Sequence, residues 1–157
     1  MSLLTRRILF LLWMLCLPTI GLAQQADAPT STLAPVPWPG SGDAQVDRAL
    51  ADINDYAARY PASFADELSR YYSVPRTYVE AMMKQGDWTA GDIYMSCALA
   101  QVAGQPCRAV VREWSRDHTG GWRDVAARWE VKPGGAQYRR LRKSLDDTYR
   151  RWERPTP

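Results

Sequence analysis

The stretch from Ile93 to Ala103 constrains the fold more than any other part of this sequence, because it is apolar on nearly every side of a helix. A helix without a polar face is stable in water only when other elements surround it. Thr89 and Asp92 stand just before the stretch at the spacing of a capping box, which predicts that the helix begins there. We therefore expect a buried central helix inside an all-α domain.

The segments on both sides of this helix carry apolar residues at helical spacing and are separated by Pro and Gly. Pro61 is expected to end the first helix and Ser63 to cap the second, and Pro75, Pro106 and Trp122 each mark the start of another. The predicted inward residues are Val46, Leu50, Ile53, Tyr56, Ala57 and Tyr60 in the first helix, and Phe64, Leu68, Tyr71 and Tyr72 in the second. The predicted fold is a compact bundle of about six or seven short helices with a long C-terminal helix.

Two of the predicted helix pairs share a pattern, which suggests two related helix-turn-helix-like units. Their turns read Gly86-Asp87-Trp88-Thr89-Ala90-Gly91-Asp92-Ile93 and Gly121-Trp122-Arg123-Asp124-Val125-Ala126. In each unit the Trp is expected to cover the angle between helices, and the Asp to accept backbone amide protons of the next helix. These segments resemble a group of exported bacterial helical proteins with Gly-Trp repeats and no characterised activity. The resemblance implies a periplasmic or secreted helical domain and no catalytic residues.

Residues 1–23 have the pattern of a cleavable signal peptide. Arg6 and Arg7 precede an apolar run over residues 8–17, and the small-residue tripeptide Gly21-Leu22-Ala23 follows. The run is shorter than the ~20 residues that cross the hydrocarbon core of a bilayer. We expect cleavage after Ala23 and no stable membrane span afterwards; an uncleaved amino-terminal anchor is the alternative.

Residues 24–42, rich in Pro, Ala, Ser and Thr, are predicted to form a flexible linker, and residues 43–157 a single helical domain. Removing residues 1–23 leaves 134 residues and lowers the formal charge from +3 to +1. A chain of this size has a sizeable core without metals or many disulfides. A nearly neutral exported protein is not expected to bind nucleic acid, so we place it in the periplasm or outside the cell.

The C-terminal helix is the one locally basic segment. Its basic residues are Arg139, Arg140, Arg142, Lys143, Arg150, Arg151 and Arg154. They alternate with aromatic and leucine positions, which is typical of an amphipathic helix with a solvated side. Contact with an anionic lipid surface or an acidic partner is the alternative interpretation.

Two cysteines follow the predicted cleavage site, Cys97 and Cys107, and they bracket the turn residues Gly104 to Pro106. An oxidising compartment and an even count favour a disulfide that joins the end of one helix to the start of the next. Two buried free cysteines are the alternative.

No motif specifies a reaction, and no cofactor or metal is indicated. The single histidine, His118, lacks the companion ligands that zinc requires. Asp87 and Asp92 could serve as a carboxylate pair, although capping explains them better. The residues we single out as functional candidates are Asp87, Trp88, Asp92, His118, Trp122 and Asp124.

The first functional hypothesis is a non-enzymatic helical module that meets a protein or cell-envelope partner through aromatic side chains. It predicts an exposed aromatic patch. An envelope hydrolase acting on glycan or peptide is the second hypothesis, and it requires a cleft where Asp87, Asp92 or His118 converge. A periplasmic binder of a small ligand held between helix pairs is the third.

Overall fold

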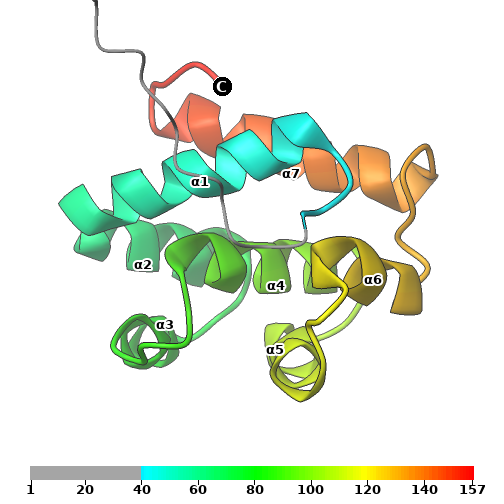
Figure 1. Ribbon diagram of the computed structural model, residues 1–157. Helices are drawn as coiled ribbons and strands as arrows, with labels where there is room; N and C mark the ends of the chain where they lie inside the picture. The colour runs from blue at the N-terminus through cyan, green and yellow to red at the C-terminus, as the bar shows by residue number, and fades with distance from the viewer. Residues whose placement is uncertain (1–39) are drawn as a thin grey trace, which may run out of the picture. The chain divides into compact units, whose positions relative to one another are not determined.

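The computed structural model describes residues 40–157, and within them the chain is helical without strands (Figure 1). The helices are α1 (Ala44–Arg59), α2 (Pro61–Tyr71), α3 (Arg76–Met83), α4 (Ala90–Val102), α5 (Cys107–Arg116), α6 (Gly121–Arg128) and α7 (Ala136–Arg151). The predicted all-α bundle with a long C-terminal helix is confirmed. The predicted signal peptide and most of the predicted linker lie outside the described residues. None of the helices in the described part is long and apolar enough to cross a membrane.

Helix α4 lies at the centre of the bundle. Figure 1 shows α1 and α7 on one side of it and α3 and α5 on the other, and α4 packs against all four. Every residue from Gly91 to Ala100 is buried as a result. The absence of a polar face in the sequence of this helix is therefore explained by its surroundings.

Both ends of α4 are fixed by local hydrogen bonds. The Thr89 hydroxyl accepts the backbone amide of Asp92 at 3.1 Å, and the Asp92 carboxylate accepts the backbone amide of Thr89 at 3.3 Å, which completes the predicted capping box. At the other end Gly104 has a left-handed φ of 68°, and the amide of Gln105 donates to the carbonyl of Ala100 at 2.8 Å. This is a Schellman motif, which favours glycine at its left-handed position.

Helices α1 and α4 approach each other closely at Gly91. Its backbone amide donates to Asn54 Oδ1 on α1 at 2.7 Å. A Cβ added at Gly91 would lie 2.7 Å from the carbonyl oxygen of Leu50. Because this distance is shorter than any ordinary contact, the crossing of the two helices requires glycine at this position.

The corner between α1 and α2 is tighter than the sequence predicts. Helix α2 begins at Pro61, directly after the corner residue Tyr60, so the predicted cap at Ser63 is wrong. Proline suits the first position of a helix because no amide is needed there, and it pushes the preceding residue out of the helical region. Tyr60 accordingly has φ −132° and ψ 59° and lies on the outside of the corner, not in the core.

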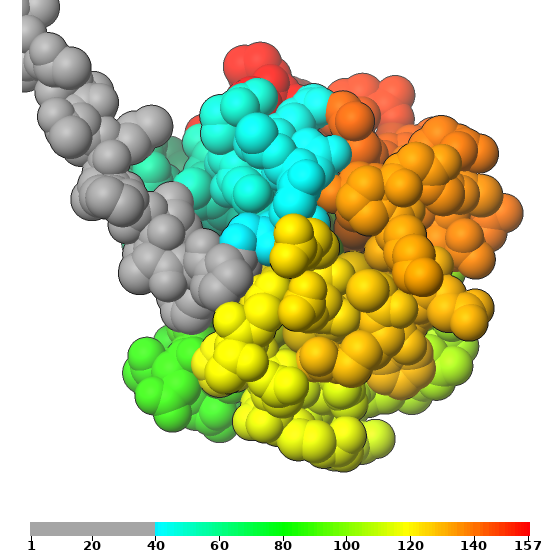
Figure 2. All heavy atoms as spheres, turned by 45° about the vertical axis from the view of Figure 1, so that its right-hand side comes forward, coloured from blue at the N-terminus to red at the C-terminus, as the bar shows by residue number. Residues whose placement is uncertain are grey.

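Folded contacts begin before α1, within the last residues of the predicted linker. The backbone amide of Ser41 donates to Asp47 Oδ1 at 2.7 Å, and the carbonyl of Gly40 accepts the amide of Arg123 at 3.2 Å. Figure 2 shows the start of α1, in cyan, against the segment of α6, in yellow. Asp43 then caps α1 by accepting the amides of two following residues.

Cys97 and Cys107 form the predicted pair, with their Sγ atoms 2.01 Å apart. Cys97 lies in the body of α4 and Cys107 is the first residue of α5. The bridge therefore holds α5 against the central helix across the Gly104 turn.

Candidate functional site

Asp92 and Trp122 come from different Gly-Trp turns and meet in the interior. The indole Nε1 of Trp122 donates to Asp92 Oδ1 at 2.9 Å, while the Thr89 hydroxyl donates to Asp92 Oδ2 at 2.6 Å. Asp92 is only 4% exposed. Its carboxylate thus links the start of α4 to α6, and its acceptor capacity is largely used within the fold.

A hollow of about 310 Å³ lies beside this contact, between α1, the start of α4 and α6. Leu50 and Ala51 give it an apolar wall, and Asp47 and Asn54 add polar groups from the same helix. Asp92 borders the hollow, but Asp87 and His118 do not. The convergence that the hydrolase hypothesis requires is therefore missing from the described lining.

His118 lies at the exposed end of an aromatic stack. The Trp122 ring stacks on Trp114 with centroids 3.9 Å apart, and Trp114 stacks on His118 at 4.9 Å. His118 Nδ1 is also 2.9 Å from the carbonyl oxygen of Trp114. Within residues 40–157 no group of three or more His, Cys, Asp or Glu could hold a metal ion. The contacts of His118 fit a residue that closes the stack after α5.

The remaining candidates lie apart from one another. Asp87 is exposed, and Trp88 is half-buried against the core. The Asp124 side chain is 51% exposed and lies 3.5 Å from Arg123 Nε. Helix α6 begins without a side-chain cap. The expected aspartate cap is thus present in the first Gly-Trp turn and absent in the second, although the Asp124 carboxylate lies beside Gly120 at the start of α6.

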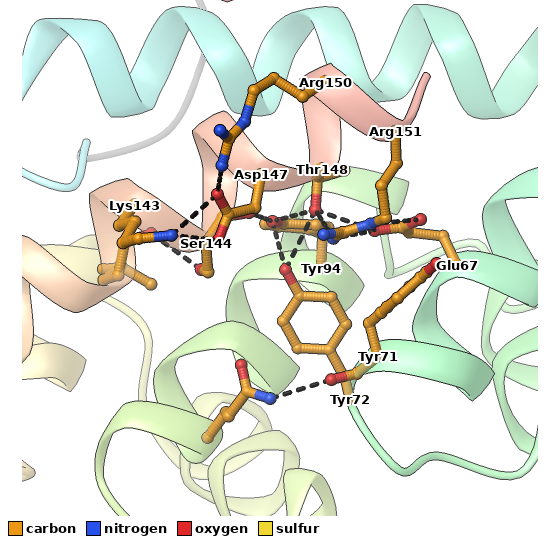
Figure 3. Close-up of polar contacts among 12 residues, drawn as sticks. Glu67, Tyr71, Tyr72, Tyr94, Lys143, Ser144, Asp147, Thr148, Arg150 and Arg151 are labelled. Atoms are coloured by element: carbon orange, nitrogen blue, oxygen red, sulfur yellow. Dashed lines mark hydrogen bonds and ion pairs between the residues drawn. The ribbon is translucent and has the colours of Figure 1, made fainter. Parts of the chain in front are cut away.

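A buried polar network joins α2, α4 and α7 (Figure 3). The Thr148 hydroxyl donates to Glu67 Oε1 at 2.9 Å, and Arg151 Nε donates to the same oxygen at 3.0 Å. The Tyr94 hydroxyl lies 3.0 Å from Thr148 Oγ1 and 2.5 Å from the hydroxyl of Tyr72. Burial raises the pKa of Tyr94 well above its ordinary value, so its hydroxyl remains a donor. These groups satisfy one another, which assigns the network to the core.

A different surface carries the exposed aromatic side chains. Among the described residues, Tyr60 and Tyr71 are the large apolar side chains that remain exposed, at 55% and 46%. They stand at the two ends of α2, next to the C-terminal ends of α1 and α7. We call this surface the tyrosine–arginine face; it consists of Tyr56, Tyr60, Tyr71, Trp152, Arg59, Arg70, Arg151 and Arg154.

Ring and guanidinium contacts hold this face in place. The Tyr56 ring stacks on Trp152 with centroids 3.8 Å apart and an interplanar angle of 14°. The guanidinium of Arg151 lies 3.9 Å above the ring of Tyr71, and Figure 3 shows the two side chains together. Such contacts order the aromatic groups before any partner arrives, which lowers the entropic cost of binding.

Two hollows open on the tyrosine–arginine face, and Tyr56, Ser63 and Trp152 border both. The first, about 430 Å³, extends toward Tyr71. The second, about 370 Å³, extends toward Tyr60. The face therefore offers concave places beside its exposed rings.

The helical spacing of apolar residues predicts that Tyr60 and Tyr71 face inward, but in the structure both side chains are exposed. Each follows an arginine at the end of its helix, Arg59 and Arg70, where the apolar stripe has already turned toward solvent. The neighbouring arginines and Pro61 were the available signals of an exposed helix end.

Most of the C-terminal basic residues have partners within the described part. Lys143 and Arg150 pair with Asp147, and Arg142 lies 3.6 Å from Asp43. Such pairing favours the interpretation of an ordinary solvated helix side over a free anion-binding surface.

No family model, curated protein or solved structure matches this chain.

Proposed function

We propose that this protein is an exported, non-enzymatic helical domain that binds a protein partner in the cell envelope through the tyrosine–arginine face. The exposure of Tyr60 and Tyr71 beside two hollows carries the proposal. Tyr, Trp and Arg are the residues that most often dominate the binding energy of protein interfaces, and they do so around pockets. This face combines all three residue types on one small area.

The polar residues that could do chemistry support a non-enzymatic role through the bonds they make. Asp92 is used by Thr89 and Trp122, and Glu67 by Arg151 and Thr148. A general acid or base must instead reach a substrate in an open cleft.

The export part of the proposal rests on the signal-peptide pattern and on the cysteine pair. A disulfide between Cys97 and Cys107 persists in an oxidising compartment and is rare in the cytosol. Measuring the intact mass of the mature protein tests this part. The mass should correspond to a chain that begins at Gln24, and it should increase by two hydrogens on reduction.

Site-specific photocrosslinking in the producing cells tests the binding face. A benzoylphenylalanine residue is placed at Tyr60, at Tyr71 or, as a control, at Arg112, which is exposed on α5 and lines neither hollow. We expect a discrete higher-mass adduct from the first two positions and none from the third. An equal adduct from Arg112, or no adduct from either tyrosine position in a folded protein, would contradict the proposal.

The hollow between α1, α4 and α6 favours a second candidate function, the binding of a small ligand. Its volume of about 310 Å³ reaches the lower range of known ligand pockets. Native mass spectrometry of the exported protein should then show an additional mass that disappears on denaturation. Ala51→Phe, which fills the hollow from α1, should remove this mass, and a wild-type mass equal to the polypeptide alone would argue against the candidate.

A further inference from the structure

We propose that the hollow between Tyr60 and Trp152 receives a carboxylate side chain of an acidic protein partner. This inference rests on the proposed function, since it names the chemistry recognised by the same face. The hollow measures about 370 Å³, and its lining contains two guanidinium groups and no carboxylate. A carboxylate is the group that guanidinium binds with the best geometry, through paired hydrogen bonds.

Arg154 borders this hollow and carries a buried donor without an acceptor among the described residues. Its Nη2 donates to Asp52 Oδ1 at 2.7 Å, whereas its Nη1 is buried without a hydrogen-bond acceptor in the described structure. A buried donor without a partner is costly and rare in native proteins. Because Nη1 is shielded from solvent, a carboxylate bound in the hollow would accept from it once the Arg154 side chain turns toward the hollow.

Arg59 supplies a second, freely available charge. It is exposed, and its side chain makes no hydrogen bond or ion pair within residues 40–157. Arg151, by contrast, is held by Glu67 in the neighbouring hollow. Arg70 is likewise exposed, but it borders the neighbouring hollow, whose lining includes three acidic residues. Arg59 is therefore the unpaired arginine that stands beside the hollow without an acid in its lining.

The charge pattern of the two hollows favours a protein over a polyanionic glycan or an anionic membrane. The neighbouring hollow is bordered by three acidic residues, Asp66, Glu67 and Glu153, and by two arginines, Arg70 and Arg151, so it has no excess of positive charge to attract a second anion. A protein can present one carboxylate to the hollow between Tyr60 and Trp152 and neutral or basic groups to the neighbouring hollow. In addition, Trp152 covers one face of the Tyr56 ring, so a sugar cannot stack on that face.

Two peptides that differ by a single charge test the inference. Acetyl-Tyr-Glu-Tyr-amide and acetyl-Tyr-Gln-Tyr-amide are titrated into the ¹⁵N-labelled mature protein and followed by NMR. We expect the Glu peptide to perturb Arg59, Tyr60 and Trp152 and to bind about tenfold more tightly than the Gln peptide. Arg59→Gln should remove most of this preference, while Arg112→Gln should leave it unchanged.

Equal affinity for the two peptides, perturbations away from the hollow, or no binding of either peptide would overturn the inference. Tighter binding of a uronic-acid hexasaccharide or of phosphatidylglycerol vesicles, lost in Arg59→Gln, would overturn the choice of a protein partner. If crosslinking at Tyr60 persists while the two peptides bind equally, the interaction module stands and only the acidic partner is refuted. If crosslinking at both tyrosines also fails, the proposed function falls with it.

Discussion

Replacing Asp92 by alanine should destabilise the domain by about 1.5–4 kcal/mol. The substitution leaves the indole N–H of Trp122 buried without an acceptor, because Trp122 is only 2% exposed. An unsatisfied buried donor costs about 1–3 kcal/mol. The loss of the carboxylate from the first turn of α4, where it accepts the amide and hydroxyl of Thr89, adds about 0.5–1 kcal/mol.

Asp124→Ala is the matched control, since Asp124 occupies the equivalent place in the second Gly-Trp turn and its side chain is half exposed. It should cost less than about 0.5 kcal/mol. Urea unfolding, followed by circular dichroism and Trp fluorescence, measures both variants. Trp122→Phe removes the indole N–H donor. In that background, Asp92→Ala should lower the free energy of unfolding by about 1 kcal/mol less than it does in the wild-type protein. A similar cost for Asp92→Ala and Asp124→Ala, or no coupling with Trp122, would refute this reasoning.

Three further predictions concern stability. Replacing Cys97 and Cys107 by serine should lower the free energy of unfolding in urea by about 3 kcal/mol, because the bridge closes a loop with a sequence separation of 10. As a control, the variant should be as stable as the wild-type protein whose disulfide has been reduced. Gly91→Ala should cost about 1–3 kcal/mol because its Cβ would meet a backbone carbonyl of α1, whereas Gly86→Ala, with nothing within 4 Å, should be neutral in the same assay. Burial raises the pKa of Tyr138 to about 12 from an ordinary value of 10.0. Stability from this residue is therefore fully present below pH 10.0 and is lost as the pH rises toward about 12. Urea midpoints measured across this range should fall less steeply in Tyr138→Phe, and identical profiles would contradict the assignment.

The helices were predictable because their signals are local. The apolar period, the prolines before α3 and α5, and the Thr89–Asp92 capping box act over three to four residues. The Cys97–Cys107 pair was predictable for a related reason, since a short loop keeps its two ends close. The likeness of the two Gly-Trp turns to those of exported helical proteins remains a prediction.

The candidate site was less accessible to prediction. The helical spacing of apolar residues in α1 and α2 predicted that Tyr60 and Tyr71 face inward, yet both are exposed. The spacing shows which side of a helix is apolar, but not where the helix extends beyond the core. Glu67 was not singled out at all, although it is 5% exposed and paired with Arg151. A single buried glutamate has no sequence signature, because its partner lies on another helix.

The sequence by itself determined that the domain is helical, where most helices begin and end, that α4 is central, and which cysteines pair. Only the tertiary structure decided that Trp122 binds Asp92, that Glu67 meets Thr148 and Arg151, and that the ends of α1, α2 and α7 form one face. The physical reason is distance along the chain. Backbone preferences and caps act between near neighbours, whereas these contacts join residues 30 to 84 positions apart and exist only after the helices have packed.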